Sequence, residues 1–201
     1  MEKLGGLILA AGLSSRMGDY KPLMDIDGRS MIGRVVDMMC EAGAKTIVVV
    51  TGHRREELEA HLENEQVEFV FNPEYATTQQ LESLKLGLSA LKGRCEQIMI
   101  SPADVPLVSP ETVKILMNLE GDFIRPLFHG EPGHPVFLKE DWISYIKNYD
   151  GPGGLKGAVE SNSEMKLVSL EVTDKGVILD NDTKEDLERL FRWHNKKDQY
   201  V

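Results

Sequence analysis

Short runs of apolar residues alternate along the chain with segments in which apolar residues recur every three to four positions. The runs are GLILA (6–10), TIVVVT (46–51), VEFVF (67–71) and QIMISP (97–102). They are too short for helices, and they are apolar enough to be buried on both faces, as the strands of a parallel sheet are. We therefore predict four parallel strands up to residue 102.

Helical spacing separates these runs, most clearly in the segments 32–39 and 81–91. Gly43 stands where the first of these helices would end. Ser109 and Pro110 suit the N-cap and the first position of a further helix, so we expect one to begin there. The order βαβαβαβα, which runs to about residue 120, predicts right-handed crossovers and a doubly wound sheet.

The pattern becomes less regular after Gly121, and no linker, repeat or low-complexity segment interrupts it. We therefore expect a single domain over residues 1–201. The later elements are three strands, FIRPLF (123–128), HPVFL (134–138) and KLVSLEV (166–172), a short helix EDWISYIKNY (140–149), a Gly-rich loop GPGGLKG (151–157), and a closing helix with its apolar side at Leu187, Leu190 and Phe191.

Composition narrows the class of protein. Of 201 residues, 41% are hydrophobic and 28% charged, which is typical of a soluble globular protein, and no stretch approaches the roughly 18 apolar residues of a membrane span. No secretory signal is visible, and Cys40 and Cys95, in a predicted helix and a predicted loop, lack metal-ligand spacing. We therefore expect a cytoplasmic protein with free thiols. A net charge of −10 without a basic cluster argues against nucleic acid as a partner, so an anionic ligand needs local cations.

The stretch LILAAGLSSRMGDYK (7–21) carries the first such cations. It leads from the first predicted strand into a loop, at the edge of the sheet where ligands bind in open α/β folds. Gly12 and Gly18 permit tight turns, while Arg16 and Lys21 supply positive charge for phosphates. The spacing matches neither a P-loop nor a dinucleotide fingerprint. A Gly/Ser surface turn with two solvated cations is the alternative.

Four motifs in order carry a resemblance to a known family. LAAGLSSRMGDYKPL (9–23) resembles the signature loop of the nucleotidyltransferases that include the molybdenum cofactor guanylyl- and cytidylyltransferases. SPADVPLV (101–108), GEPGHPVFL (130–138) and LDNDTKEDL (179–187) resemble three later motifs of that family. The resemblance extends from residue 6 to about residue 190, and four ordered motifs are far more specific than one.

The resemblance implies a three-layer α/β/α, Rossmann-like nucleotidyltransferase fold with a mostly parallel central sheet. Residues 1–120 would bind the nucleoside triphosphate and residues 121–201 the acceptor. It further implies Mg²⁺-dependent transfer of a nucleoside monophosphate to a phosphorylated acceptor such as the molybdopterin cofactor, with release of pyrophosphate. In-line attack by a phosphate needs positioning and charge neutralisation more than a general base. A molybdoenzyme or an accessory protein would be the protein partner, and neither nucleic acid nor a membrane is expected.

The resemblance also assigns roles to individual residues. The catalytic groups would be Arg16, Lys21 and Asp104. The backbone at 9–11 would meet the base, and the acceptor pocket would be shaped by Gly133, His134 and Pro135, with Lys156 offering a cation. The full nucleotide-binding set would be Leu9, Ala10, Ala11, Gly12, Ser14, Ser15, Arg16, Lys21, Ser83 and Asp104.

Two aspartates are candidate metal ligands. Asp104 follows a predicted buried strand, and Mg²⁺ is usually held by one or two carboxylates plus substrate phosphates, although Asp also commonly stabilises turns. The resemblance makes Asp182 a second metal contact, but its position three residues before Glu185 also suits a capping box. Asp180 could substitute for it. His134 has a comparable alternative as a polar turn residue, and Lys156 as part of a surface loop.

The sequence departs from the family where glycines usually precede the Ser-bearing helix, because residues 77–80 are Thr-Thr-Gln-Gln. Long polar side chains there would reshape the acceptor pocket. Ala11 stands where guanylyl-transferring relatives tend to have Gly, which favours CTP over a purine nucleotide. Two alternatives remain open: the same chemistry on a sugar phosphate or another phosphorylated alcohol, and a nucleotide-binding accessory protein without turnover.

Overall fold

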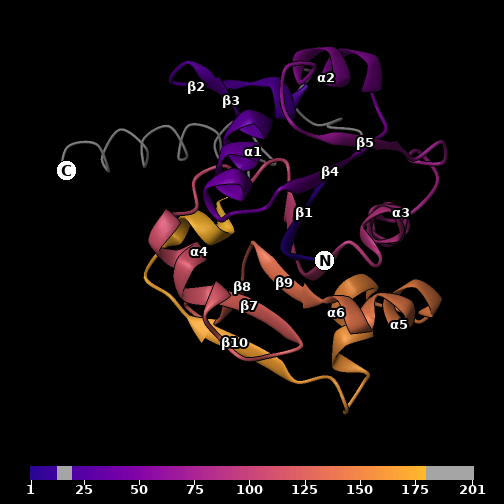
Figure 1. The fold of residues 1–201 in the computed structure, drawn as a ribbon, viewed down its shortest axis with the longest axis vertical. Helices are drawn as coiled ribbons and strands as arrows, with labels where there is room; N and C mark the ends of the chain where they lie inside the picture. Colours follow the sequence, from indigo (N-terminus) through magenta and orange to yellow (C-terminus); the bar gives the residue numbers. More distant parts are fainter. Residues whose placement is uncertain (13–19, 180–201) are drawn as a thin grey trace.

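Residues 1–12 and 20–179 are described by the computed structural model, in which helices cover both faces of an eight-stranded sheet (Figure 1). A two-stranded hairpin, β2 (Asp25–Ile26) and β3 (Arg29–Ser30), lies apart from that sheet. The strands of the main sheet are β1 (Glu2–Ala10), β4 (Thr46–Thr51), β5 (Glu68–Phe71), β6 (Cys95–Pro102), β7 (Phe123–Phe128), β8 (Glu131–Pro132), β9 (Val136–Lys139) and β10 (Leu167–Glu171).

The sheet has the order β10-β7-β9-β6-β1-β4-β5, with β8 paired to β7. Strands β6, β1, β4 and β5 are parallel to their neighbours in that group, and β10 is parallel to β7. Strand β9 lies between β6 and β7 and is antiparallel to both. The prediction of a mostly parallel central sheet is therefore confirmed.

Helices form the two outer layers. The α-helices are α1 (Met31–Glu41), α2 (Arg55–His61), α3 (Gln80–Leu91), α4 (Pro110–Met117), α5 (Ile143–Asn148) and α6 (Gly154–Glu160), and short 3-10 turns cover Lys21–Leu23, Glu140–Trp142 and Lys175–Ile178. Buried residues of α1, α2 and α4 join one hydrophobic cluster, and those of α3, α5 and α6 join another on the opposite face (Figure 1). This arrangement confirms the three-layer α/β/α architecture.

Local sequence signals explain several boundaries. The β-branched run TIVVVT forms β4, and all six residues are buried. Ser109 caps α4, because its side chain accepts a hydrogen bond from the backbone N–H of Thr112 at 3.3 Å. Gly43, with φ of +92°, follows the end of α1, in a conformation that favours glycine. These helix boundaries agree with the prediction.

Three expectations need correction. VEFVF does not become a strand buried on both faces: β5 is the last strand in the sheet order, and Glu68 and Phe71 are exposed. GPGGLKG is not a loop throughout, because α6 begins at Gly154. Cys95 opens β6 instead of lying in a loop, although both cysteines are free thiols as expected. The predicted closing helix lies outside the described residues.

The chain order creates a switch point beside β1. After β1 the chain adds β4 and β5 on one side, and then returns to place β6 on the other side. Leu9 is opposite Pro102 in the β1–β6 register, and the backbone N–H of Ala103 donates to the carbonyl of Leu9 at 3.1 Å. The carboxyl ends of β1 and β6 therefore lie side by side, where open α/β sheets bind ligands.

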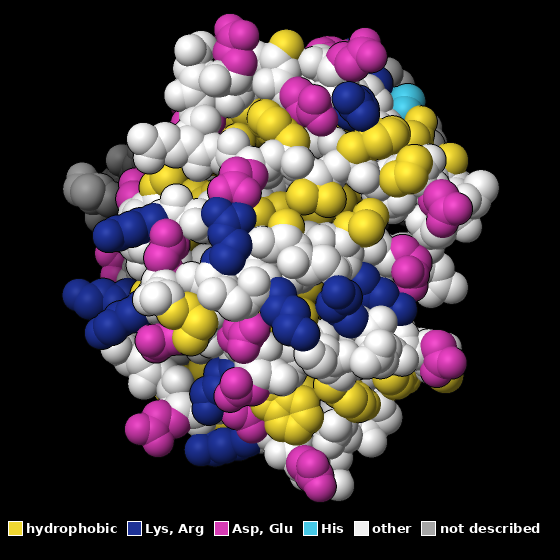
Figure 2. All heavy atoms as spheres, turned by 45° about the vertical axis from the view of Figure 1, so that its right-hand side comes forward, with side chains coloured by type: hydrophobic (Ala, Val, Ile, Leu, Met, Phe, Trp, Pro, Cys, Tyr) yellow, Lys and Arg dark blue, Asp and Glu magenta, His cyan; other side chains and the backbone are white. Residues whose placement is uncertain are grey.

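On the face that Figure 2 turns forward, acidic and basic side chains are interspersed with small apolar patches. Within residues 1–12 and 20–179, no helix has the length and apolar character needed to cross a membrane.

Candidate functional site

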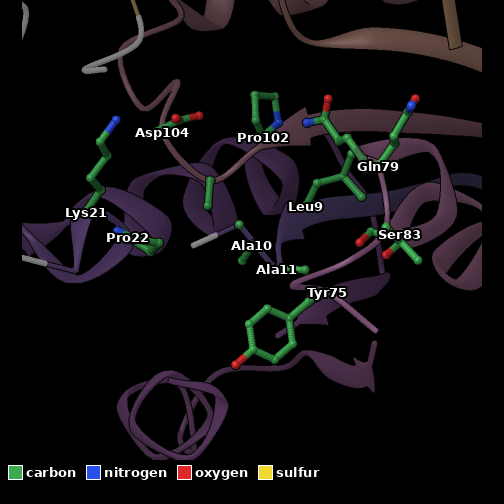
Figure 3. A pocket seen from close by; sticks show the side chains of 14 residues that line it. Leu9, Ala10, Ala11, Lys21, Pro22, Tyr75, Gln79, Ser83, Pro102 and Asp104 are labelled. Atoms are coloured by element: carbon green, nitrogen blue, oxygen red, sulfur yellow. The ribbon is translucent and has the colours of Figure 1, made fainter. Parts of the chain in front are cut away.

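A cavity of about 240 Å³ opens at the carboxyl ends of β1 and β6 (Figure 3). Its walls come from the loop after β1, the 3-10 turn that follows, the N-terminal part of α3 with the segment before it, and the turn after β6. Lining residues include Leu9, Ala10, Ala11, Gly12, Lys21, Tyr75, Thr78, Gln79, Gln80, Ser83 and Asp104. Five of the predicted nucleotide-binding residues in the first 21 positions, together with Ser83 and Asp104, therefore border one space.

The backbone after β1 is held in place by the loop after β4. The carbonyl of Ala11 accepts a hydrogen bond from the backbone N–H of His53 at 3.4 Å. A Cβ atom on Gly52 would lie 2.6 Å from that carbonyl oxygen, so only glycine permits this approach. A Cβ on Gly12 would meet no described atom within 4 Å, so the lack of a side chain there leaves space open at the cavity.

Lys21 brings a buried cation to the cavity. Only 5% of the residue is exposed, although lysine is rarely buried without compensating interactions. It begins the 3-10 turn, in which the backbone N–H of Met24 donates to the carbonyl of Lys21 at 3.0 Å. In the view of Figure 3 its ammonium group reaches the same end of the cavity as the carboxylate of Asp104. The two side chains thus bring opposite charges to one end of the site.

Tyr20 anchors the described chain just before Lys21. Burial raises the pKa of its phenol to about 12, an effect that the nearby charge of Arg54 partly opposes, so the hydroxyl stays protonated at neutral pH. It donates to the carbonyl of Ala10 at 3.4 Å, and the Arg54 guanidinium lies 5.1 Å from the ring centroid. These contacts tie the Lys21 turn to the end of β1.

Asp104 lies two residues beyond the end of β6 and is half-buried. The structure therefore places it at the strand end, as the sequence predicted. Among the residues that the structure describes, no three His, Cys, Asp or Glu side chains form a group that could hold a metal. A single carboxylate at a cavity edge nevertheless suits Mg²⁺, which commonly takes its other ligands from water and substrate phosphates. Asp104 could hold a divalent cation in that way.

Ser83 reaches the cavity because α3 packs closely on the sheet. Four residues later in the helix, a Cβ on Gly87 would collide with the side chain of Leu7 and lie 2.9 Å from that of Val50. Glycine at this position lets the helix backbone approach β1 and β4. Ser83 is buried and lines the cavity from the first turns of the helix.

A second cavity of about 440 Å³ adjoins the first and shares Leu9, Gln79 and Gln80 with it. Gly133, His134 and Lys156 line it, whereas the buried Pro135, which follows a cis peptide bond, does not. Other walls are mostly apolar and come from both halves of the chain: Leu81, Leu84, Ile100, Phe123, Pro132, Val136, Leu155 and Val159.

His134 is a neutral polar group in this apolar cavity. Burial lowers the pKa of its imidazole to about 4, although hydrogen bonding to the backbone of Ile100 acts in the opposite direction. Its buried Nδ1 atom has no hydrogen-bond partner among the described residues. The backbone N–H donates to the carbonyl of Val177 at 2.8 Å, and a Cβ on Gly133 would lie 2.5 Å from that carbonyl oxygen. Glycine at 133 therefore allows the contact that holds His134.

Two cations line the second cavity, and they differ in how firmly their side chains are held by the protein. Arg125 donates to the Ser169 hydroxyl at 3.0 Å and lies 3.5 Å from the carboxylate of Glu160. Lys156, on α6, is exposed. An anionic ligand would therefore meet a tethered guanidinium and a more adjustable ammonium group.

Some predicted residues cannot be placed and some lining residues were not predicted. Ser14, Ser15 and Arg16, together with Asp180 and Asp182, lie outside the described residues. The predicted set omitted Tyr75, Gln79 and Gln80, as well as Thr78 and Arg125. The unusual Thr-Thr-Gln-Gln segment was the available signal for the two glutamines, which line both cavities.

Comparison with known proteins identifies related sequences. The MobA-like NTP transferase domain matches residues 6–166. The molybdenum cofactor cytidylyltransferase of Escherichia coli (strain K12) is 27% identical over 188 residues, covering 92% of this chain and 94% of that protein. The bifunctional protein GlmU of Thermoanaerobacter pseudethanolicus is 35% identical over 188 residues, covering 88% of this chain. The chain spans only 40% of the length of that GlmU.

Solved structures share the architecture. Rv0371c from Mycobacterium tuberculosis superposes with a TM-score of 0.81 at 23% identity, covering 95% of this chain and 98% of that one. Its complex with manganese superposes with a TM-score of 0.74 at 22% identity, covering 94% and 98%. At these identities the likeness establishes the fold.

Proposed function

Because the chain belongs to the family of MobA-like NTP transferase domains, we propose that it transfers CMP from CTP to a phosphorylated acceptor and releases pyrophosphate. The observation that carries this proposal is the pair of adjoining cavities, which share Leu9, Gln79 and Gln80. One is suited to a nucleotide and the other to an acceptor, and their common wall is where the reacting phosphates would meet.

The donor would occupy the first cavity with its triphosphate toward Lys21. An oxygen of the acceptor phosphate attacks the α-phosphorus and forms the new P–O bond, while the bond to the bridging oxygen breaks and its electron pair leaves with pyrophosphate. The attacking oxygen is already anionic at neutral pH, so no proton has to be removed. Lys21 would bind and orient the phosphates and stabilise the charge that develops on them. Arg16, in the same sequence motif, is proposed to share this role.

Asp104 is the proposed principal ligand for Mg²⁺, with Asp182 as the candidate second contact. When bound, Mg²⁺ would neutralise triphosphate charge and orient the donor. The manganese complex of Rv0371c supports divalent-metal binding on this fold. The half-buried position of Asp104 at the strand end lets its carboxylate reach a ligand in the cavity without disturbing the core.

The second cavity favours an acceptor with a ring system, and we propose the molybdopterin cofactor. Its walls are mostly apolar, and the hydroxyl groups of a sugar would lose hydrogen bonds to water against them. The similarity to the Escherichia coli molybdenum cofactor cytidylyltransferase over 92% of the chain supports the same acceptor. The preference for CTP rests on Ala11, whose methyl group takes space beside the proposed base site.

Pyrophosphate release tests the proposal directly. Purified protein with Mg²⁺ would be offered each of the four NTPs in combination with molybdopterin cofactor or glucose 1-phosphate. We expect release to be greatest with CTP and molybdopterin cofactor. Release only with the sugar phosphate would retain the reaction and replace the acceptor.

Direct measurement of NTP binding distinguishes a remaining alternative. Tight NTP binding without turnover on any acceptor would indicate an accessory protein that binds nucleotide. A failure to bind any NTP in the presence of Mg²⁺ would contradict the proposal at its first step. Product analysis by mass spectrometry, which distinguishes a CMP adduct from a GMP adduct, would identify the nucleotide transferred.

A further inference from the structure

Asn72 is a buried polar residue that directly follows β5, close to the first cavity, which is called the nucleotide cavity below. The proposed mechanism gives it no role. Only 3% of the residue is exposed. Its backbone N–H donates to the carbonyl of Thr51 at 2.9 Å, which ties it to the end of β4. Its side chain makes hydrogen bonds to three groups, two in the segment before α3 and one in the first turn of α3.

The hydrogen bonds of the Asn72 side chain define its orientation. Its Oδ1 accepts from the backbone N–H of Glu74 at 2.9 Å. Its Nδ2 donates to Ser83 Oγ at 2.9 Å and to Thr78 Oγ1 at 3.3 Å. A backbone N–H can only donate, so the atom that faces Glu74 must be the amide oxygen, and the NH₂ group must face the two hydroxyls.

The direction of the hydrogen bond at Ser83 follows from this orientation. An amide NH₂ group is a donor only, so Ser83 Oγ is the acceptor in that contact. Thr78 behaves consistently, since its hydroxyl donates to the carbonyl of Glu74 at 2.8 Å and accepts from Asn72. The hydroxyl hydrogen of Ser83 has no acceptor among the described residues, and Ser83 borders the nucleotide cavity.

We infer that Asn72 is a positioning residue, which holds Ser83 so that its O–H group donates a hydrogen bond to the nucleotide. The nucleotide atom that meets Ser83 must then be an acceptor, such as a carbonyl oxygen or an unprotonated ring nitrogen of the base. The inference rests on the proposed function, because it requires a nucleotide in the first cavity. It adds a residue that does not touch the nucleotide but makes Ser83 the donor in its hydrogen bond to the nucleotide.

A double-mutant cycle separates positioning from general support of the fold. NTP affinity would be measured by calorimetry without acceptor for the wild type, Asn72→Ala, Ser83→Ala and the double variant. We expect each single variant to bind NTP roughly three- to tenfold more weakly, the effect of one hydrogen bond. Asn72→Ala should weaken binding little further once Ser83 is alanine, because the group through which it acts is gone.

The outcomes distinguish the two proposals. If the wild type binds an NTP but Asn72→Ala is as damaging in the Ser83→Ala background as alone, or harmless in both, the positioning role is wrong and the proposed function stands. If the wild type binds no NTP, both fail. The KM for the acceptor should stay near the wild-type value in all variants, since the Asn72–Ser83 contact belongs to the nucleotide cavity.

Two further variants protect the test against a folding defect. Asn72→Asp keeps an oxygen for the Glu74 N–H, but its ionised carboxylate accepts from Ser83 and turns that hydroxyl away from the cavity, so it should also weaken NTP binding. Asn118→Asp is the matched control, because Asn118 makes a single amide hydrogen bond to the carbonyl of Lys114 at the exposed end of α4. It should retain wild-type NTP affinity, and weakening as large as that of Asn72→Asp would overturn the inference.

Discussion

The two adjoining cavities share a wall but are lined by different groups. The nucleotide cavity takes backbone from the end of β1, a buried lysine and a carboxylate, whereas the acceptor cavity is walled mainly by apolar side chains around a neutral histidine. A triphosphate needs charge and N–H donors, and a ring-shaped acceptor needs apolar contact. Under the proposed function, the reacting phosphates would therefore bind in the first cavity, and the acceptor would be selected in the second.

The largest expected effect comes from removing the carboxylate of the nucleotide cavity. Asp104→Ala should lower kcat by about a thousandfold, because it deletes the proposed Mg²⁺ ligand and with it the charge stabilisation of the transition state. The melting temperature should change little, since Asp104 is half-buried at a strand end. Asp141→Ala, which removes an exposed carboxylate on the Glu140–Trp142 turn, is the control. Near-normal pyrophosphate release by Asp104→Ala would refute the metal role.

The neutral His134 of the acceptor cavity should make the stability of the protein sensitive to acid. Between its ordinary pKa of 6.5 and its folded value of about 4, the imidazole of His134 is protonated in the unfolded chain but not in the folded one. Stability should therefore fall as the pH drops from about 6.5 to about 4, by up to about 3 kcal/mol from this group.

Urea unfolding of the wild type and His134→Gln across this pH range provides the measurement. Other titrating groups contribute to both proteins, so the difference between their pH profiles isolates the imidazole. The variant should lose less stability on acidification. Identical pH dependence in the two proteins would show that His134 does not titrate as expected.

Replacing one lysine by methionine in each cavity tests how much its positive charge contributes there. Lys21→Met keeps the buried stem but removes the ammonium group, so it should reduce kcat/KM for NTP roughly ten- to fiftyfold, with both binding and turnover affected. Lys156→Met should raise only the KM for the acceptor, by about threefold, because an exposed cation contributes little. A loss confined to acceptor KM in Lys21→Met would place the first loop against the other substrate.

The smallest expected effects come from Asp182, which is either a helix N-cap or a metal contact. As an N-cap, Asp182→Asn should be nearly harmless, and Asp182→Ala should lower stability by ~1 kcal/mol. As a metal contact, Asp182→Asn should raise the Mg²⁺ requirement while the melting temperature barely moves. Titration of activity with Mg²⁺, together with thermal melts of both variants, decides between them. Normal Mg²⁺ dependence in a stable Asn variant would leave the metal site to Asp104, with Asp180 as the remaining candidate.

Much of the fold was predictable because its signals are local. The run TIVVVT needs only its β-branched residues to favour a strand, and the Ser109–Pro110 pair needs only its own chemistry to start a helix. The GPGGLKG segment shows the limit. Its glycines disfavour a helix, yet α6 forms there, with Ala158 and Val159 buried against the cluster that includes α3. Tertiary packing outweighed local propensity.

The direction and neighbours of β9 were not predictable in the same way. Nothing within VFLK predicts that this strand lies antiparallel between β6 and β7, because strand pairing depends on groups distant in the chain. That placement matters for the site, since the GHP segment immediately precedes β9. It carries Gly133 and His134 to the wall of the acceptor cavity.

The sequence by itself determined which groups stand at the ends of strands: a loop with Lys21 after β1 and Asp104 after β6 follow from the order of apolar runs and polar turns. Only the tertiary structure decided that these two side chains border one cavity, that Gln79 and Gln80 border two, and that Asn72 faces Ser83. The physical reason is one of range. Backbone propensity and capping act over a few neighbouring residues, whereas a cavity is formed by the packing of segments distant in sequence, such as the turn after β6 and the start of α3.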